Sequence, residues 1–167
     1  VIKNHGLEGG ASIVHSHSQI TAINILPPAL AEEAAAIKKH LQANGNQCPY
    51  CSILNTEKNS FRRCFENNYA VAFTPYASRF NFEIWIFPRR HFRQLSDATA
   101  DELQGISDIL QLVLRKLMEL NTAYNYVLHY LPEAETGDFH FHIEVQPRIS
   151  TWAGFEFGSG MEISTIE

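Results

Sequence analysis

The chain has no long apolar run, no excess of basic residues and few cysteines. No stretch approaches the roughly 20 apolar residues that a membrane-spanning helix needs, and the basic and apolar segments of a secretion signal are missing at the start. The formal net charge of -5 disfavours an extended nucleic-acid surface, although it leaves open a local pocket for one anionic ligand. We therefore expect a cytoplasmic protein that binds neither membranes nor nucleic acids.

Only three cysteines are present, and Cys48 and Cys51 form the spacing CPYC. In a reducing compartment, two cysteines at this spacing indicate a metal or redox site more than a structural disulfide. Later in the chain, His91 follows PRR, and His140 belongs to a His-x-His pair. Two thiolates and two imidazoles suit tetrahedral zinc, so these four residues are the predicted metal ligands.

The remaining pattern predicts an α+β domain. The 167 residues, of which 45% are hydrophobic, suffice for one domain with its own core. Thr99 and Glu102 have capping-box spacing, and apolar residues then recur every three or four positions, which predicts a long helix packed on an antiparallel sheet. The other expected elements are an extended segment at 11–26, a helix at 28–44, and strands near 61–74, 80–88, 124–131, 139–147 and 154–164.

Two short segments, VHSHSQITA and FHFHIEVQP, each place two histidines one residue apart. On a strand such histidines share one face. A neutral imidazole can attack an α-phosphate while a hydrogen bond to its other nitrogen fixes the tautomer. The glycines before His15 let backbone N–H groups approach phosphate oxygens, Ser12 can add a donor, and Gln19 can hold a phosphoryl oxygen. This pattern favours a nucleotidyl-histidine intermediate on His17.

The residues NHG…GGAS…HSHSQ resemble the active-site segment of the galactose-1-phosphate uridylyltransferase family, a branch of the histidine-triad superfamily. The form HSHSQ is particularly similar to ADP-glucose phosphorylase-like members. The resemblance implies a histidine-triad-like antiparallel sheet with one long packed helix. It implies that His17 is the nucleophile and Gln19 its phosphoryl-oxygen partner. The substrate contacts that it implies are Asn4, Gly10, Ser12 and, within GFEFGSG, Glu156.

The resemblance also implies how the chain is divided and assembled. Family members carry two such domains in tandem. Residues 1–28 would be the last part of the first domain and carry HSHSQ, residues 29–46 a linker helix, and residues 47–167 the second domain. The implied reaction exchanges a nucleotidyl group between a nucleotide sugar, such as UDP-glucose, and a sugar 1-phosphate, and the implied assembly is a homodimer.

A second set of metal ligands competes with the first. By the resemblance, Glu33, His129, His140 and His142 fall where some uridylyltransferases hold a second metal. His140 cannot serve both sets fully, so the choice between them stays open at this point. We prefer the cysteine set for structural zinc, because thiolates bind zinc tightly.

Three other functions remain open. One is ADP-glucose phosphorylase-like adenylyl transfer to phosphate, and a second is a zinc-stabilised fragment that only binds or dimerises. The third is a histidine-triad nucleotide hydrolase with His142 as nucleophile. Glu144 disfavours the hydrolase, because a carboxylate near the attacked phosphate repels its charge. Base, sugar and acceptor are left open by the sequence.

Overall fold

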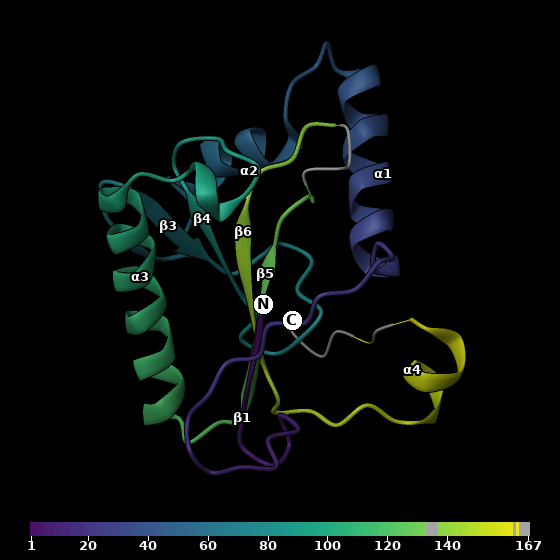
Figure 1. The fold of residues 1–167 in the computed structure, drawn as a ribbon, viewed down its shortest axis with the longest axis vertical. Helices are drawn as coiled ribbons and strands as arrows, with labels where there is room; N and C mark the ends of the chain where they lie inside the picture. The colour runs from purple at the N-terminus through teal and green to yellow at the C-terminus, as the bar shows by residue number, and fades with distance from the viewer. Residues whose placement is uncertain (133–136, 162, 164–167) are drawn as a thin grey trace.

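The computed structural model describes residues 1–132, 137–161 and 163. Its centre is a six-stranded antiparallel sheet with the spatial order β1-β5-β6-β4-β3-β2 (Figure 1). The strands are β1 (Ile2–His5), β2 (Arg63–Glu66), β3 (Ala70–Phe73), β4 (Ile84–Pro88), β5 (Tyr124–His129) and β6 (His142–Pro147). The predicted α+β class with an antiparallel sheet is confirmed.

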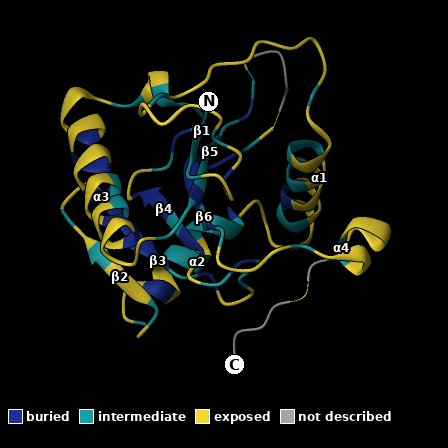
Figure 2. Ribbon diagram, turned by 90° about the horizontal axis from the view of Figure 1, so that it is seen from below, coloured by how far each residue is buried: buried dark blue, intermediate teal, exposed yellow. Residues whose placement is uncertain are grey.

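Helices cover both faces of the sheet. Figure 2 shows α3 on one side of the strands and α1 on the other. The helices are α1 (Pro28–Ala43), α2 (Pro49–Glu57), α3 (Ala100–Glu119) and α4 (Gly154–Ser159), and one 3₁₀ turn spans Leu95–Asp97. No helix in the described part of the chain is long and apolar enough to cross a bilayer.

The long helix α3 forms the main core with the sheet. Its predicted capping box is present, because the Thr99 side chain accepts from the backbone N–H of Glu102 and the Glu102 carboxylate accepts from that of Thr99. The apolar stripe of α3 packs on the sheet face that carries Ala70, Ala72, Ile86, Phe141 and Ile143. Burial of this stripe is what fixes α3 against the strands.

The opposite face of the sheet carries aromatic and histidine side chains. Because side chains alternate along a strand, Phe73 and Phe87 point away from α3 and pack against α2. His142 lies on this same face and stacks on Phe87 with a centroid distance of 4.6 Å. Tyr50 of α2 adds a further ring 5.1 Å from His142. The α2 face therefore brings buried histidines close to the CPYC segment.

Three segments differ from the sequence predictions. The segment 61–74 forms two strands, because the Asn67 side chain accepts from the backbone N–H groups of Tyr69 and Ala70 and closes a turn between them. The expected extended segment at 11–26 keeps only one isolated bridge, between Ile2 and Gln19. The strand expected at 154–164 is wrong over residues 154–159, which form helix α4, and residues 162 and 164 of that segment lie outside the described residues.

Signals at the two ends of α4 explain why this segment is helical. The Glu156 carboxylate accepts from the backbone N–H of Ala153 at 3.0 Å, which caps the first turn. Gly160 then ends the helix in the left-handed conformation, with φ +67. Phe155 and Phe157 are both exposed, so burial of these rings does not favour a strand here. The capping carboxylate and the terminating glycine favour a helix instead.

Candidate functional site

The strand β1 leads into a tight glycine turn at residues 6–11. The backbone N–H of Gly10 donates to the Leu7 carbonyl at 2.9 Å. The backbone N–H of Ala11 donates to the Gly6 carbonyl at 3.0 Å. Gly10 has φ +78, which glycine adopts without strain, and a Cβ built there would meet nothing within 4 Å. The turn is therefore open to a ligand on its Gly10 side.

The other side of the turn is closed at Gly9, which is buried. A Cβ built at Gly9 would lie 2.3 Å from the His5 carbonyl oxygen and 3.0 Å from that of Tyr124. Both obstacles are backbone atoms, which cannot move aside as a flexible side chain can. The turn can therefore pack this closely on β5 only with glycine at this position.

The predicted substrate contacts fall in two places. Asn4, Gly10 and Ser12 lie in β1 and its turn, whereas Glu156 lies in α4, which stands apart from β1 in both views (Figures 1 and 2). The N–H of Gly10 already donates within the turn. A phosphate at this turn would therefore rely on the Asn4 side chain and the exposed Ser12 more than on that N–H group.

The predicted nucleophile His17 is half-buried. Its Nδ1 atom lies 2.8 Å from the carbonyl oxygen of His15. A carbonyl oxygen only accepts, so Nδ1 carries the proton, and Nε2 is left as the atom with a free electron pair. A neutral imidazole fixed in this way has the tautomer that a nucleophile toward phosphorus needs.

The segment around His17 is tied to the sheet at its end. Ile2 and Gln19 exchange two backbone hydrogen bonds, with N···O distances of 3.0 and 2.8 Å. The Ser18 hydroxyl lies 3.2 Å from the Tyr126 hydroxyl of β5. His15, Ser18 and Gln19 are exposed. The structure thus places His17 and Gln19 along an extended piece of chain beside β1.

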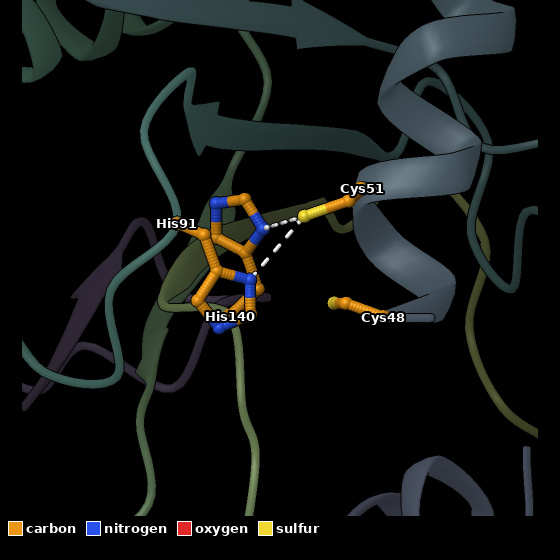
Figure 3. Close-up of side chains that lie close together, drawn as sticks. All are labelled: Cys48, Cys51, His91 and His140. Carbon is orange, nitrogen blue, oxygen red and sulfur yellow. Dashed lines mark hydrogen bonds between the residues drawn. The ribbon is translucent and has the colours of Figure 1, made fainter. Parts of the chain in front are cut away.

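The predicted zinc ligands lie together in the structure. Cys48 and Cys51 stand on one face at the start of α2 and point toward His91 and His140 (Figure 3). The Cys51 sulfur lies 3.3 Å from Nδ1 of His91 and 3.6 Å from Nδ1 of His140. The four ligand atoms all lie within 4.8 Å of one another. We call these four residues the cysteine cluster.

Hydrogen bonds orient both imidazoles of the cysteine cluster. Nε2 of His140 lies 3.1 Å from the Pro88 carbonyl oxygen and must donate to it, so Nδ1 is free to face the thiols. Nε2 of His91 lies 2.7 Å from an oxygen of Asp138. Histidines that ligate metals characteristically use their second nitrogen in this way. The geometry and the donor types therefore fit a zinc ion.

The two thiols have opposite pKa shifts. Burial alone would raise the pKa of Cys48, but hydrogen bonds with His140 and His91 outweigh it and lower the pKa to about 6. Burial, together with the nearby charge of Cys48, raises the pKa of Cys51 to about 12. One thiolate is therefore present near neutral pH, and a bound cation would remove the proton from the second.

A second group of potential ligands lies on the same face of the sheet. Glu33 of α1, His129 of β5 and His142 of β6 place their ligand atoms within 4.8 Å of one another. An oxygen of Glu33 lies 2.8 Å from Nδ1 of His129, and its other oxygen accepts from the Tyr50 hydroxyl at 2.5 Å. We call Glu33, His129 and His142 the carboxylate cluster.

His142 carries an unsatisfied atom in the carboxylate cluster. Its Nδ1 donates to the His140 carbonyl oxygen at 3.0 Å, so in the neutral ring the free electron pair lies on Nε2. That Nε2 is buried and makes no hydrogen bond within the described residues. It faces oxygens of Glu33 and Glu144 at 3.7 and 3.8 Å. A metal ion would satisfy such an electron pair.

Charged groups surround the carboxylate cluster. Burial would raise the pKa of Glu33, but its hydrogen bond to His129 and the charge of His142 lower it. Burial would likewise raise the pKa of Glu144, but His142, His129 and Arg79 lower it to about 2. The guanidinium of Arg79 bridges Glu144 and the buried Glu83, its Nη2 lying 3.0 Å from the latter. The carboxylates of Glu33 and Glu144 are therefore ionised at neutral pH.

The two predicted metal sets are thus two separate groups. His140 belongs to the cysteine cluster, and His142 belongs to the carboxylate cluster, so the two share no ligand. Sequence reasoning missed Asp138, which orients His91, and Arg79, which neutralises two buried carboxylates. Asp138 had a signal, since it stands two residues before His140. Arg79 lies in a polar turn whose sequence carries no such signal.

One protein family and several curated proteins match the chain. A family described as "Domain of unknown function (DUF4921)" matches residues 1–167. The chain belongs to this family. It is 33% identical over 175 residues to an ADP-glucose phosphorylase from Arabidopsis thaliana, with 99% of this chain and 48% of the relative covered. It is 29% identical over 153 residues to a galactose-1-phosphate uridylyltransferase from Thermotoga maritima, covering 88% of this chain and 48% of the relative.

A solved structure also resembles this chain. The ADP-glucose phosphorylase from Arabidopsis thaliana with bound ADP-glucose superposes with a TM-score of 0.87 at 29% identity, covering 99% of this chain and 54% of that one. The resemblance to the uridylyltransferase and phosphorylase branch of the histidine-triad superfamily is thereby confirmed. This DUF4921 chain spans about half the length of the curated relatives it matches.

Proposed function

We propose that this DUF4921 chain carries the nucleophilic histidine segment of a nucleotidyltransferase that acts on nucleotide sugars. Nε2 of His17 attacks the α-phosphorus, a nitrogen–phosphorus bond forms, and the bond from that phosphorus to the bridging oxygen breaks. The sugar 1-phosphate leaves with the bridging oxygen. An oxygen of an incoming phosphate or sugar phosphate then attacks the same phosphorus and releases His17.

One observation carries this proposal. The 2.8 Å hydrogen bond from Nδ1 of His17 to the His15 carbonyl holds the free electron pair on Nε2. The same bond stays available to stabilise the positive charge that the ring gains when Nε2 bonds to phosphorus. Gln19, two residues on, offers an amide donor for a phosphoryl oxygen without removing a proton from the nucleophile.

Two substrate pairs fit the proposal. Exchange between UDP-glucose and a hexose 1-phosphate is the first. Adenylyl transfer from ADP-glucose to phosphate is the second, and the 33% identity to the plant ADP-glucose phosphorylase favours it. Asn4, Gly10 and Ser12 are proposed to contact the nucleotide phosphates, and Glu156 of α4 the sugar.

Zinc is the metal that we propose for the cysteine cluster. Two thiolates and two imidazoles satisfy its preferred tetrahedral shell. Such an ion would join the start of α2 to the chain after β4 and before β6, and its role would be structural. The carboxylate cluster, with one carboxylate and two imidazoles, is proposed to hold a second divalent cation.

Assembly and domain division are part of the proposal. Residues 1–28 are assigned to the end of one histidine-triad-like domain, residues 29–46 to a linker helix and residues 47–167 to a second domain. The pairing of β1 with β5 supports a sheet that continues from one domain into the other. We propose a homodimer, as the resemblance implies.

A non-catalytic zinc-stabilised protein that only binds or dimerises is the second candidate, and the assembled cysteine cluster, which needs no substrate for a structural role, favours it. A hydrolase using His142 receives less support, because that ring is fully buried and its Nε2 faces carboxylates.

The reaction is tested by mixing the chain, alone and within its complete natural protein, with UDP-glucose or ADP-glucose. The proposal expects one equivalent of sugar 1-phosphate per site before any acceptor is added, with ping-pong kinetics once it is. Release only from the complete protein would assign the isolated chain to the non-catalytic class. Steady release with water as acceptor would overturn the transferase and favour the hydrolase.

A further inference from the structure

The Asn125 side chain joins three parts of the molecule that are far apart in sequence. Asn125 lies in β5, directly opposite Asn4 of β1. Its Nδ2 donates to Oδ1 of Asn4 and to the carbonyl oxygen of Gly9, both at 2.7 Å. Its Oδ1 accepts from Nε of Arg148 at 2.7 Å. The two protons and the oxygen of this amide are thus all engaged.

Arg148 fixes which way the Asn125 amide is turned. A guanidinium has no acceptor, so the atom that faces Arg148 must be the Asn125 oxygen. The amide nitrogen then necessarily faces Asn4 and Gly9. Arg148 is itself held from two sides, because its backbone N–H donates to the Ala123 carbonyl at 2.7 Å and its guanidinium lies 5.1 Å from the ring centroid of Phe80.

The orientation of Asn125 in turn sets the orientation of Asn4. Because Oδ1 of Asn4 accepts from Asn125, the Nδ2 donor of Asn4 points the other way. A donor suits phosphate and nucleotide oxygens, which only accept. The bond to the Gly9 carbonyl fixes the peptide immediately before Gly10, on the open side of the turn. One amide therefore sets both a ligand donor and the shape of the turn.

Arg148 also reaches the arm that carries Glu156. Its guanidinium lies 5.9 Å from the ring centroid of Trp152, and that ring stacks on Phe80 at 5.8 Å with an interplanar angle of 4°. Trp152 contacts Phe157 of α4 edge to face, at 6.0 Å. The same guanidinium thus touches the network behind the turn and the base of the α4 arm.

We propose that Asn125 and Arg148 are positioning residues for the nucleotide: Arg148 orients the Asn125 amide, and that amide presents the Asn4 donor and the glycine turn to the nucleotide phosphates. The inference rests on the proposed function, since it assigns the turn to nucleotide binding. Neither residue touches the reacting atoms. Both residues affect the affinity for the substrate more than the rate of the chemical step.

The test measures KM, kcat, nucleoside-diphosphate affinity and melting temperature for Asn125→Ala, Asn125→Asp and Arg148→Lys in the complete natural protein. Each variant should raise KM and Kd about tenfold or more while kcat changes less than about threefold, because uniform binding is lost. Asn125→Asp should be the worst, since it places acceptors against Asn4 and Gly9. Arg148→Lys should bind as weakly as the other variants although it keeps the positive charge, because lysine lacks the Nε donor that orients the Asn125 amide.

Two comparisons separate positioning from a purely structural effect. Asn44→Ala removes an exposed amide that donates to the His40 carbonyl, and it should leave all four quantities unchanged. If Asn125 acts through Asn4, the Kd effects of Asn4→Ala and Asn125→Ala should not add in the double variant. Additive effects, or losses of kcat and melting temperature with unchanged KM and Kd, would overturn the inference. If the unsubstituted protein neither binds nor turns over a nucleotide sugar, the proposed function fails first.

Discussion

His140 and His142 stand two residues apart, on one face of the chain at the start of β6, and belong to different clusters. Nδ1 of His140 faces the Cys51 sulfur at 3.6 Å, whereas Nε2 of His142 faces Glu33 at 3.7 Å. A contact to the backbone explains part of this difference. Nδ1 of His142 donates to the carbonyl oxygen of His140, so only Nε2 of His142 can face the carboxylates. The two rings therefore direct different nitrogens toward different sets of donors.

The second His-x-His pair repeats the geometry of the first. In both, Nδ1 of the later histidine donates to the carbonyl oxygen of the earlier one, at 2.8 Å in His15–His17 and 3.0 Å in His140–His142. His17 is half-buried, whereas His142 is fully buried beside the carboxylates of Glu33 and Glu144. We propose that the same local hydrogen bond serves a nucleophile at His17 and a metal ligand at His142.

Zinc uptake should release protons and strengthen as pH rises. Zinc needs both thiolates, and at pH 7 Cys48, with a pKa of about 6, has lost its proton while Cys51, with a pKa of about 12, has kept it. We expect at least one proton released per zinc near pH 7.5, because Cys51 must lose its proton and the pKa of His91 is also raised, mainly by its hydrogen bond with Cys48, and we expect affinity to rise at least tenfold per pH unit. Calorimetry in buffers with different ionisation enthalpies measures this release.

The third cysteine, Cys64, provides the control for the prediction on zinc binding. Cys51→Ser should abolish tight binding, whereas Cys64→Ser should not change it, because Cys64 is an exposed thiol outside the cluster. A proton release of zero, or equal losses in the two variants, would contradict the assignment of the cysteine cluster.

Removing the Arg79 guanidinium should destabilise the fold more than removing a surface arginine. Arg79→Met leaves the carboxylates of Glu83 and Glu144 buried without their cation, which we expect to lower the free energy of unfolding by about 2–3 kcal/mol. Arg89→Ala breaks a pair with Glu66 in which both side chains are more than a third exposed, and should cost about 1 kcal/mol or less. Urea unfolding at pH 7 compares the two, and equal losses would contradict the role given to Arg79.

The glycine turn should not tolerate a side chain on its closed side. Gly9→Ala places a Cβ against the His5 and Tyr124 carbonyl oxygens, so the turn must move away from β5. We expect nucleotide-sugar affinity to fall at least tenfold, measured by calorimetry. Asn44→Ala, which removes an exposed amide that donates to the His40 carbonyl, is the control and should bind as the parent does. Equal affinity for all three proteins would show that the turn does not contact the ligand.

Local signals in the sequence predicted much of this fold. The capping pair Thr99 and Glu102 and the apolar stripe that follows gave α3, and the helix expected at 28–44 is present as α1. The strand expected at 154–164 failed, because the capping carboxylate of Glu156 and the terminating Gly160 decide that segment. The extended segment at 11–26 lacks a ladder of pairing partners beyond the bridge at Ile2.

The sequence predicted some residues of the candidate site and missed others. Spacing and resemblance named all the residues of both clusters, but they left His140 open to either, since its place depends on which ring nitrogen the Pro88 carbonyl engages. Asn125 and Arg148 escaped notice because their role arises from tertiary contacts, from Asn125 to Asn4 across more than a hundred residues and from Arg148 to Asn125 across 23. Such a contact leaves no local pattern in the sequence.

The most direct test of the central claim is the location of a covalent nucleotide. The complete natural protein is mixed with labelled UDP-glucose or ADP-glucose, quenched without acceptor and examined by intact and peptide mass spectrometry. We predict one nucleotidyl group per chain on the peptide that contains His17, lost in His17→Asn and kept in Asn44→Ala. A nucleotidyl group that persists in His17→Asn, or one found on the peptide that contains His142, would contradict the account.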